Sequence, residues 1–139
     1  MIRFVVVAVV FLFFIGCAST PKKYNERHYQ TLLCNELDGK MEYVLEDKTR
    51  VDCLTQEYAI EVDFAKKWAE GIGQSLYYAN MTGKKPAIGL IMNKEKDQRY
   101  FKRLNKIAKQ YEIKIFMLER VSKGSSNWQS MSIGKNKIN

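Results

Sequence analysis

The chain has 139 residues, of which 46% are hydrophobic and 27% charged, and it contains only 2 Pro and 8 Gly. This composition excludes collagen-like, fully disordered and multi-span membrane proteins, and it indicates an ordinary globular core in one domain. The formal net charge of +8, from 23 basic and 15 acidic side chains, favours anionic partners such as nucleic acid, phospholipid head groups or lipopolysaccharide.

The chain begins with a segment typical of exported proteins. Arg3 precedes an unbroken apolar run over residues 4–15, which is shorter than the roughly 20 apolar residues of a spanning helix. The order of basic, apolar and small residues is that of a signal peptide, predicted over residues 1–16.

The end of this segment, Phe14-Ile15-Gly16-Cys17, resembles the lipobox of bacterial lipoproteins. The resemblance implies that Cys17 is acylated and becomes the new amino terminus, followed by a lipidated linker over residues 17–23. An uncleaved N-terminal anchor with an incidental Cys17 is the alternative. Both interpretations place the domain in the cell envelope, held at the membrane and facing the periplasm or the cell exterior.

Cys34 and Cys53 remain once Cys17 is assigned to the lipid. In an oxidising compartment they can form one disulfide, and two buried free thiols are the alternative that we expect. His28 is the only histidine, which excludes zinc sites built on several histidines and every mechanism that needs a second one.

The helices are predicted from apolar residues at helical spacing. Residues 25–37 form the first, residues 65–81 the second, closed by Thr82-Gly83, and residues 97–110 the third. The third helix carries a basic outer face that includes Lys102, Lys106 and Lys109.

The strands are predicted from alternation and from apolar runs between turn signals. They lie at 41–46, 50–54, 58–64, 86–92 and 113–118, and the fourth reads as buried on both faces in a parallel position. The resulting order, α-β-β-β-α-β-α-β, predicts an α/β (α+β) domain over residues 24–119 with a central mixed sheet flanked by helices. Residues 120–139 are predicted to be a poorly ordered basic tail.

Acidic residues gather on the second and third strands. A two-residue turn at Gln56-Glu57 makes paired positions sum to 113, so that Asp52 lies opposite Glu61 with their β-carbons about 5 Å apart. Alternation places Asp63 and Arg50 on the same face, whereas Val51, Cys53, Ile60 and Val62 point to the other, apolar face.

Opposed carboxylates favour a hard cation such as Mg²⁺ or Mn²⁺. Lys67 and Gln74 share a face of the second helix, from which an ammonium or amide can meet these carboxylates. The alternative is purely structural: Asp63 caps the helix, Glu61 and Lys67 form a surface ion pair, and Asp52 is solvated.

Three strings carry a family resemblance: residues 49–55 (TRVDCLT), residues 59–65 (AIEVDFA), and Lys67-Trp68 with Ile72-Gly73-Gln74. They resemble the PD-(D/E)XK, restriction-endonuclease-like nuclease superfamily, and specifically its small branches. The similarity covers about residues 26–118 and includes the predicted order of elements.

The resemblance implies a restriction-endonuclease-like fold and a metal site. Glu26 matches the helical acid, Asp52 the Asp, and Glu61 the (D/E), so these three are the expected Mg²⁺ or Mn²⁺ ligands. Asp63 stands where the superfamily has Lys, and Lys67 fits a lysine that has moved to the following helix. Gln74 resembles the helical Gln of the resolvase-like branch.

Two functions follow from this pattern. The first is a Mg²⁺-dependent nuclease, exported as a lipoprotein, whose basic helix attracts the phosphates of DNA or RNA. The second is a catalytically inactive lipoprotein that keeps the nuclease-like scaffold and binds an envelope component or partner protein.

Overall fold

The computed structural model describes residues 23–121. In chain order it contains α1 (Glu26–Glu36), β1 (Lys40–Val44), β2 (Arg50–Leu54), β3 (Tyr58–Phe64), a 3₁₀ turn η1 (Ala65–Lys67), α2 (Trp68–Thr82), β4 (Lys85–Met92), α3 (Gln98–Gln110) and β5 (Lys114–Glu119). The predicted order of helices and strands is confirmed. The predicted signal peptide, Cys17 and the tail from residue 122 lie outside the described residues.

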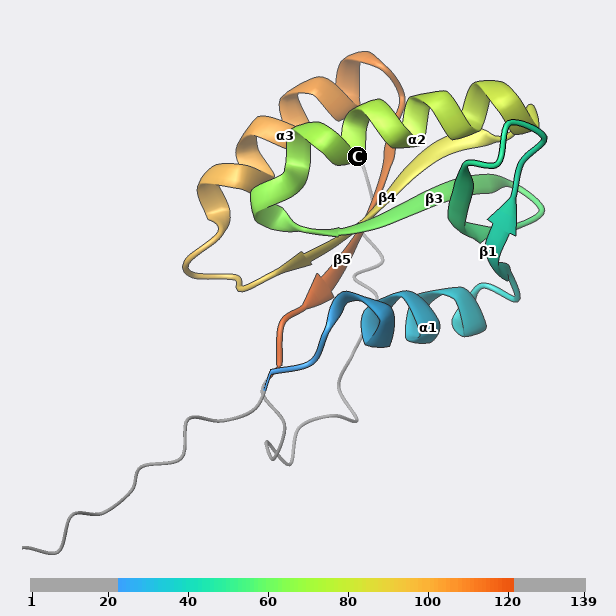
Figure 1. Cartoon of the computed structure of the whole chain (residues 1–139). Helices are drawn as coiled ribbons and strands as arrows, with labels where there is room; N and C mark the ends of the chain where they lie inside the picture. Colours follow the sequence, from blue (N-terminus) through green and yellow to red (C-terminus); the bar gives the residue numbers. More distant parts are fainter. Residues whose placement is uncertain (1–22, 122–139) are drawn as a thin grey trace, which may run out of the picture.

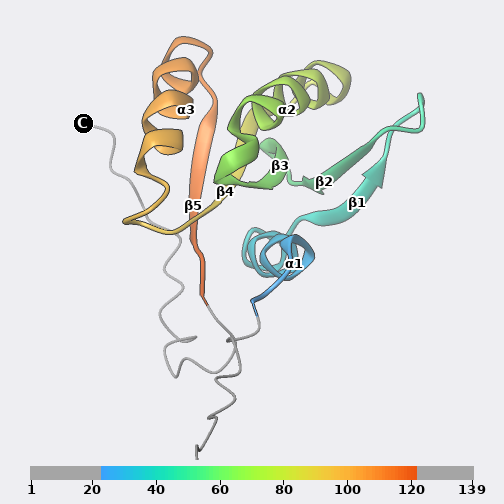
Figure 2. The same cartoon turned by 60° about the vertical axis from the view of Figure 1, so that its left-hand side comes forward.

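The five strands form one mixed sheet in the order β1-β2-β3-β4-β5. The pairs β1–β2 and β2–β3 are antiparallel, and β3–β4 and β4–β5 are parallel. The long crossovers through α2 and α3 produce the parallel half, because parallel neighbours need a connection that returns the chain to the same edge. The antiparallel β1–β2 hairpin projects away from the rest of the sheet (Figure 2).

The helices cover the sheet on both faces: α1 on one, α2 and α3 on the other (Figure 1). The core beneath α1 joins its Tyr29 and Leu33 to Ile60 and Val62 of β3. The core beneath α2 and α3 is built on alternate residues of β4, Ile88, Leu90 and Met92. Strand β4 is therefore buried on both faces, as its continuous apolar run predicts.

Helix boundaries follow local chemistry. The Asn25 side chain accepts a hydrogen bond from the His28 backbone N–H at 3.2 Å and caps α1. At the end of α2, Gly83 adopts a left-handed conformation with φ +66°, which glycine tolerates without strain. The second helix differs from prediction at its start, because residues 65–67 form the 3₁₀ turn and α2 begins at Trp68.

The ordered chain continues past residue 119, where the sequence places the start of the tail. The Arg120 N–H donates to the Met92 carbonyl at 2.9 Å, and the Val121 N–H donates to the Tyr29 hydroxyl at 3.0 Å. These bonds fasten the end of β5 to β4 and to α1. No helix within residues 23–121 is long and apolar enough to cross a membrane.

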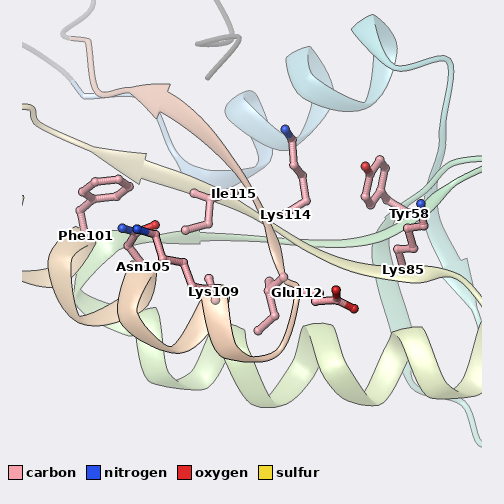
Figure 3. Close-up of a pocket in the computed structure, with 10 residues that line it drawn as sticks. Tyr58, Lys85, Phe101, Asn105, Lys109, Glu112, Lys114 and Ile115 are labelled. Carbon is pink, nitrogen blue, oxygen red and sulfur yellow. The ribbon is translucent and has the colours of Figure 1, made fainter. Parts of the chain in front are cut away.

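A cavity of about 490 Å³ lies beside β5, an edge strand of the sheet, and beneath α3 (Figure 3). It opens at the end of the sheet where β3, β4 and β5 begin, as its lining residues Tyr58, Lys85 and Lys114 are the first of those strands. Asp63 lies near the other end of β3, so the cavity is separate from the acidic residues described next.

Candidate functional site

The register between β2 and β3 is the one that the sequence predicts. Cys53 pairs with Ile60 and Leu54 with Ala59, and both sums equal the predicted 113. Asp52 and Glu61 come directly after these pairs on neighbouring strands, and after burial the charge of Asp52 is the next cause that raises the pKa of Glu61. The predicted antiparallel register is therefore confirmed at the two pairs next to the acids.

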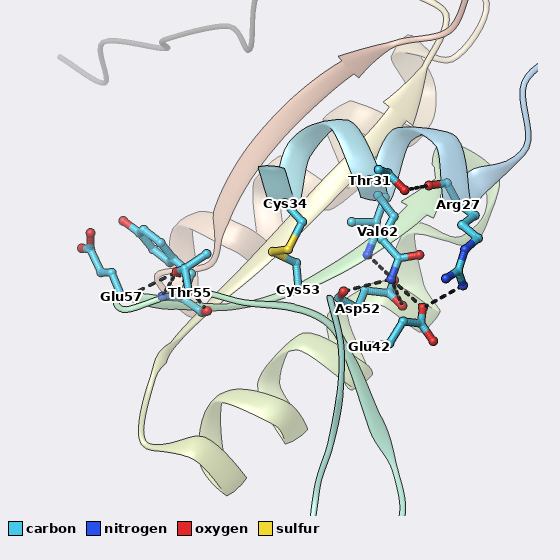
Figure 4. Close-up of a disulfide and its surroundings, with 11 residues drawn as sticks. Arg27, Thr31, Cys34, Glu42, Asp52, Cys53, Thr55, Glu57 and Val62 are labelled. Carbon is cyan, nitrogen blue, oxygen red and sulfur yellow. Dashed lines mark hydrogen bonds and ion pairs between the residues drawn. A yellow bond between two sulfur atoms is a disulfide. The ribbon is translucent and has the colours of Figure 1, made fainter. Parts of the chain in front are cut away.

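Asp52 is held by hydrogen bonds rather than solvated (Figure 4). Its Oδ2 accepts the Val62 backbone N–H at 2.9 Å, and its Oδ1 accepts Gln30 Nε2 at 3.3 Å. The same Gln30 nitrogen donates to the Asp52 carbonyl at 2.9 Å and to Glu42 Oε1 at 2.7 Å. Burial raises the pKa of Asp52 to about 6, against the Val62 hydrogen bond, which lowers it.

The predicted division of β2 into two faces is wrong at Val51. Cys53 packs beneath α1 with Ile60, as expected, but Val51 packs on the opposite side with Ala59 and Tyr78. Strand β2 pairs with β3 at Cys53 and Leu54, whereas Val51 pairs with Tyr43 of β1. Val51 thus lies in the part of β2 that belongs to the hairpin, where the face predicted from the β3 pairing does not apply.

Glu61 is the most strongly perturbed carboxyl group of the site. Its side chain is 7% exposed, and its Oε2 is buried without a hydrogen-bond partner among residues 23–121. Burial, then the charges of Asp52, Asp63 and Glu26, raise its pKa to about 9, against the opposing charge of Lys67. Without a cation, Glu61 is therefore protonated at neutral pH.

Asp63, Lys67 and Glu26 form a connected group at the end of β3. Lys67 Nζ lies 3.1 Å from Asp63 Oδ1 and 3.8 Å from Glu26 Oε2. Burial, followed by a hydrogen bond with Asp63, raises the pKa of Glu26 to about 7. The structure thus brings the helical acid and the migrated lysine to the acidic strand.

The structural alternative to a metal site is wrong in its details. Lys67 pairs with Asp63 and Glu26 in place of the expected Glu61. Asp63 does not cap the helix, because η1 begins after Phe64 and has no side-chain cap; Asp63 Oδ1 instead accepts the Phe64 N–H at 3.2 Å.

Gln74 lies one layer further along α2. It hydrogen-bonds to Tyr78, whose pKa is raised by burial first and by the Glu61 charge second. Gln74 Oε1 is buried and has no partner within the described chain. Gln74 therefore contacts Tyr78, which lies within electrostatic range of Glu61.

Sequence reasoning missed Gln30 and Tyr78 as members of the site. Gln30 lies four residues after Glu26, and the two share one face of α1. A buried glutamine on the same face as a candidate ligand is the signal that marks it. Tyr78 lies four residues after Gln74, one turn along α2. Its position on the same helix face as a candidate site residue is the signal that marks it.

A disulfide joins Cys34 of α1 to Cys53 of β2, with their α-carbons 5.6 Å apart (Figure 4). The expectation of free thiols is therefore wrong. The bond fastens α1, which supplies Glu26 and Gln30, to the strand that supplies Asp52. Gly39 permits this packing, because a β-carbon there would lie 2.5 Å from Cys53 Sγ and 2.8 Å from Cys34 Sγ.

Oxygen donors of this kind suit Mg²⁺ or Mn²⁺, and the unpartnered Glu61 oxygen fits a cation ligand. Among residues 23–121, however, no three acidic, histidine or cysteine side chains converge into a ready metal-binding group. The donor chemistry fits a hard cation at Asp52 and Glu61, and the third ligand, Glu26, is paired with Asp63 and Lys67.

No protein-family model, curated protein or solved structure matches the chain.

Proposed function

We propose that the chain is an exported, metal-dependent phosphodiesterase with a restriction-endonuclease-like core, acting on DNA or RNA. The observation that carries the proposal is the buried Glu61 carboxyl group. Its Oε2 has no hydrogen-bond partner within residues 23–121, and burial together with the charge of Asp52 on the neighbouring strand raises its pKa. Native proteins rarely leave a buried polar atom without a partner, and a missing ion is one of the usual reasons.

The arrangement of the chain supports the proposal. The α-β-β-β-α-β-α-β order and the five-stranded mixed sheet are what the resemblance of residues 49–74 implies. In this proposal Asp52 and Glu61 hold Mg²⁺ or Mn²⁺ with help from Glu26. The ion, when bound, supplies Lewis-acid polarisation of a phosphoryl oxygen and acidifies a water.

Lys67 takes the role of the lysine that the motif lacks at position 63. The Lys67 ammonium lies 3.1 Å from Asp63 Oδ1. It therefore reaches the carboxylate of Asp63, the residue that stands where the motif has lysine. From there it orients the attacking water and balances the charge of the acids around it. Gln74 offers a second buried acceptor for the same water or for substrate.

The disulfide supports export. Disulfides persist in oxidising compartments and are rare in the reducing cytosol, and Cys34–Cys53 lies within the domain core. This agrees with the predicted signal peptide and with attachment to the membrane through acylated Cys17. The exposed Lys102, Lys106 and Lys109 of α3 supply sequence-independent attraction for nucleic acid phosphates.

Cleavage assays test the proposed activity. The full chain, incubated with linear duplex DNA, single-stranded DNA and RNA in millimolar Mg²⁺ or Mn²⁺, is expected to hydrolyse at least one of them. Lys67→Ala removes the residue that orients water and should lower the rate about 100-fold or more. Glu61→Gln removes a metal ligand and should abolish the metal-dependent cleavage. Lys66→Ala, at the exposed neighbouring position, is the matched control and should cleave like the wild type.

A second candidate function is a non-catalytic lipoprotein that binds an envelope component or a partner protein. The observation that favours it is the pairing of Lys67 with both Asp63 and Glu26, which satisfies these charges without a metal. Absence of cleavage on every substrate would support this candidate. Cleavage that both Lys67→Ala and Glu61→Gln leave unchanged would support it too, because such activity would come from a contaminating nuclease.

A further inference from the structure

Helix α3 and the start of β5 supply two walls of the cavity. Phe101 and Asn105 of α3 form one wall. Ile113, just before β5, and Ile115, within it, form the other. Figure 3 shows Phe101 and Asn105 on the helix and Ile115 on the strand. A volume of about 490 Å³ falls within the usual range of small-molecule sites, about 300–1,000 Å³.

The inner surface of this cavity is mainly apolar. Phe101, Ala108, Ile113 and Ile115 supply hydrocarbon, and Ala108 and Ile113 belong to the core beneath α3. Polar groups suited to reading a nucleobase are few, since Asn105 is the only amide side chain in the lining. The surface therefore fits a hydrocarbon chain better than a heterocycle with several donors and acceptors.

The rim of the cavity carries one lysine that is free to meet an anion. Lys85 is paired with Glu57 at 3.0 Å, and the Lys114 ammonium lies 5.8 Å from the centre of the Phe116 ring, on the face of the sheet that α1 covers. Lys109 of α3 forms no ion pair with any residue of 23–121, and Glu112 is the one carboxylate in the lining. An apolar interior beside an unpaired lysine complements a molecule with a hydrocarbon body and an anionic end.

We propose that this cavity binds a single-chain amphiphile with an anionic head group, as found in fatty acids and lysophospholipids. The acyl chain lies over Phe101 and Ile115, and the head group contacts Lys109. Burial of each methylene contributes about 0.8 kcal/mol, and the lysine stems extend the apolar surface while their ammonium groups stay in water. The inference does not depend on the proposed nuclease, because the cavity lies at the opposite end of β3 from Asp63.

Photo-crosslinking of the full chain in a non-ionic detergent tests the inference. The probe is palmitate that carries a diazirine in its acyl chain, and the labelled peptide is identified by mass spectrometry. Label is expected in the peptide that spans α3 and β5. Laurate should compete, whereas 1-dodecanol, with the same chain and no charge, should not.

Variants separate the two parts of the site. Lys109→Glu should reduce labelling about tenfold or more, the effect of losing about 1.4 kcal/mol of binding free energy. Asn105→Trp should also reduce it by filling the cavity, and Lys102→Glu, on the same helix but outside the lining, is the control. A parallel probe made from lysophosphatidylglycerol distinguishes the phosphate-headed source from the free fatty acid.

Three results would overturn the inference. The first is labelling spread evenly over the chain and insensitive to Lys109→Glu. The second is competition by 1-dodecanol equal to that by laurate, since it would remove the role of the anionic head. The third is specific labelling of the cavity by an azido-adenine nucleotide with none by the palmitate probe.

Discussion

The raised pKa of Glu61 predicts that the domain loses stability as the pH rises through neutrality in metal-free buffer. The carboxyl group titrates near 4.5 in the unfolded chain and near 9 in the folded one. Between these values the folded state holds a proton that the unfolded state has released, so unfolding is favoured as the pH increases.

Glu61 dominates the window from pH 7.0 to 8.5. Asp52, with a pKa of about 6, has mostly released its proton there, and Glu26, with a pKa of about 7, loses its remaining half proton near the lower end. Glu61 still holds its proton over most of the window. One retained proton costs about 1.4 kcal/mol per pH unit. Over about 1.5 units the free energy of unfolding should therefore fall by roughly 2 kcal/mol.

Urea denaturation at several pH values in EDTA measures this effect on wild type and on Glu61→Gln. The amide keeps the shape of the protonated acid and does not titrate, so the variant should show little change between pH 7.0 and 8.5. Glu95→Gln, in the exposed loop between β4 and α3, should keep the wild-type slope. Equal losses of stability in wild type and Glu61→Gln would refute the burial of an uncompensated carboxyl group.

Three further predictions concern the scaffold and its anchor. Replacing both Cys34 and Cys53 with Ser should lower the free energy of unfolding by about 3 kcal/mol, from the chain entropy of a bridge across a separation of 19 residues, and a reductant should have the same effect on wild type in urea denaturation. Gly39→Ala should destabilise by about 1–3 kcal/mol, because its β-carbon would meet both sulfurs. In contrast, Gly73→Ala, in open space on α2, should stabilise by up to about 1 kcal/mol; equal thermal shifts for the two glycine variants would contradict the packing. Intact-mass analysis should find a mature chain that begins at an acylated Cys17, and a lipid mass retained by Cys17→Ser would contradict the assignment.

The element order and the β2–β3 register were predictable because both depend on local signals. Strand alternation and a two-residue turn at Gln56-Glu57 fix which residues pair. The same local rules fail for Val51, because it pairs with β1 whereas the β2–β3 pairs end at Cys53. Where one strand stops pairing with the next is set by the twist of the packed sheet and is not encoded in alternation.

Residue spacing could not predict the contacts of the site that depend on tertiary packing. Whether Cys34 and Cys53 form a bond depends on the distance between α1 and β2, which only the packed domain sets. The partner of Lys67 likewise depends on the 3₁₀ turn that precedes α2 and on the approach of Glu26 from α1. Sequence reasoning identified these residues as a group, and its structural alternative paired Lys67 with Glu61.

Thermal melting of the full chain with and without millimolar Mn²⁺ tests the metal site most directly. A cation that binds the folded state raises the melting temperature by an amount that grows with its concentration over the dissociation constant. We expect a concentration-dependent increase for wild type that Asp52→Asn and Glu61→Gln each remove, while Glu95→Gln retains it. A wild-type melting temperature that Mn²⁺ leaves unchanged would contradict a metal site at Asp52 and Glu61.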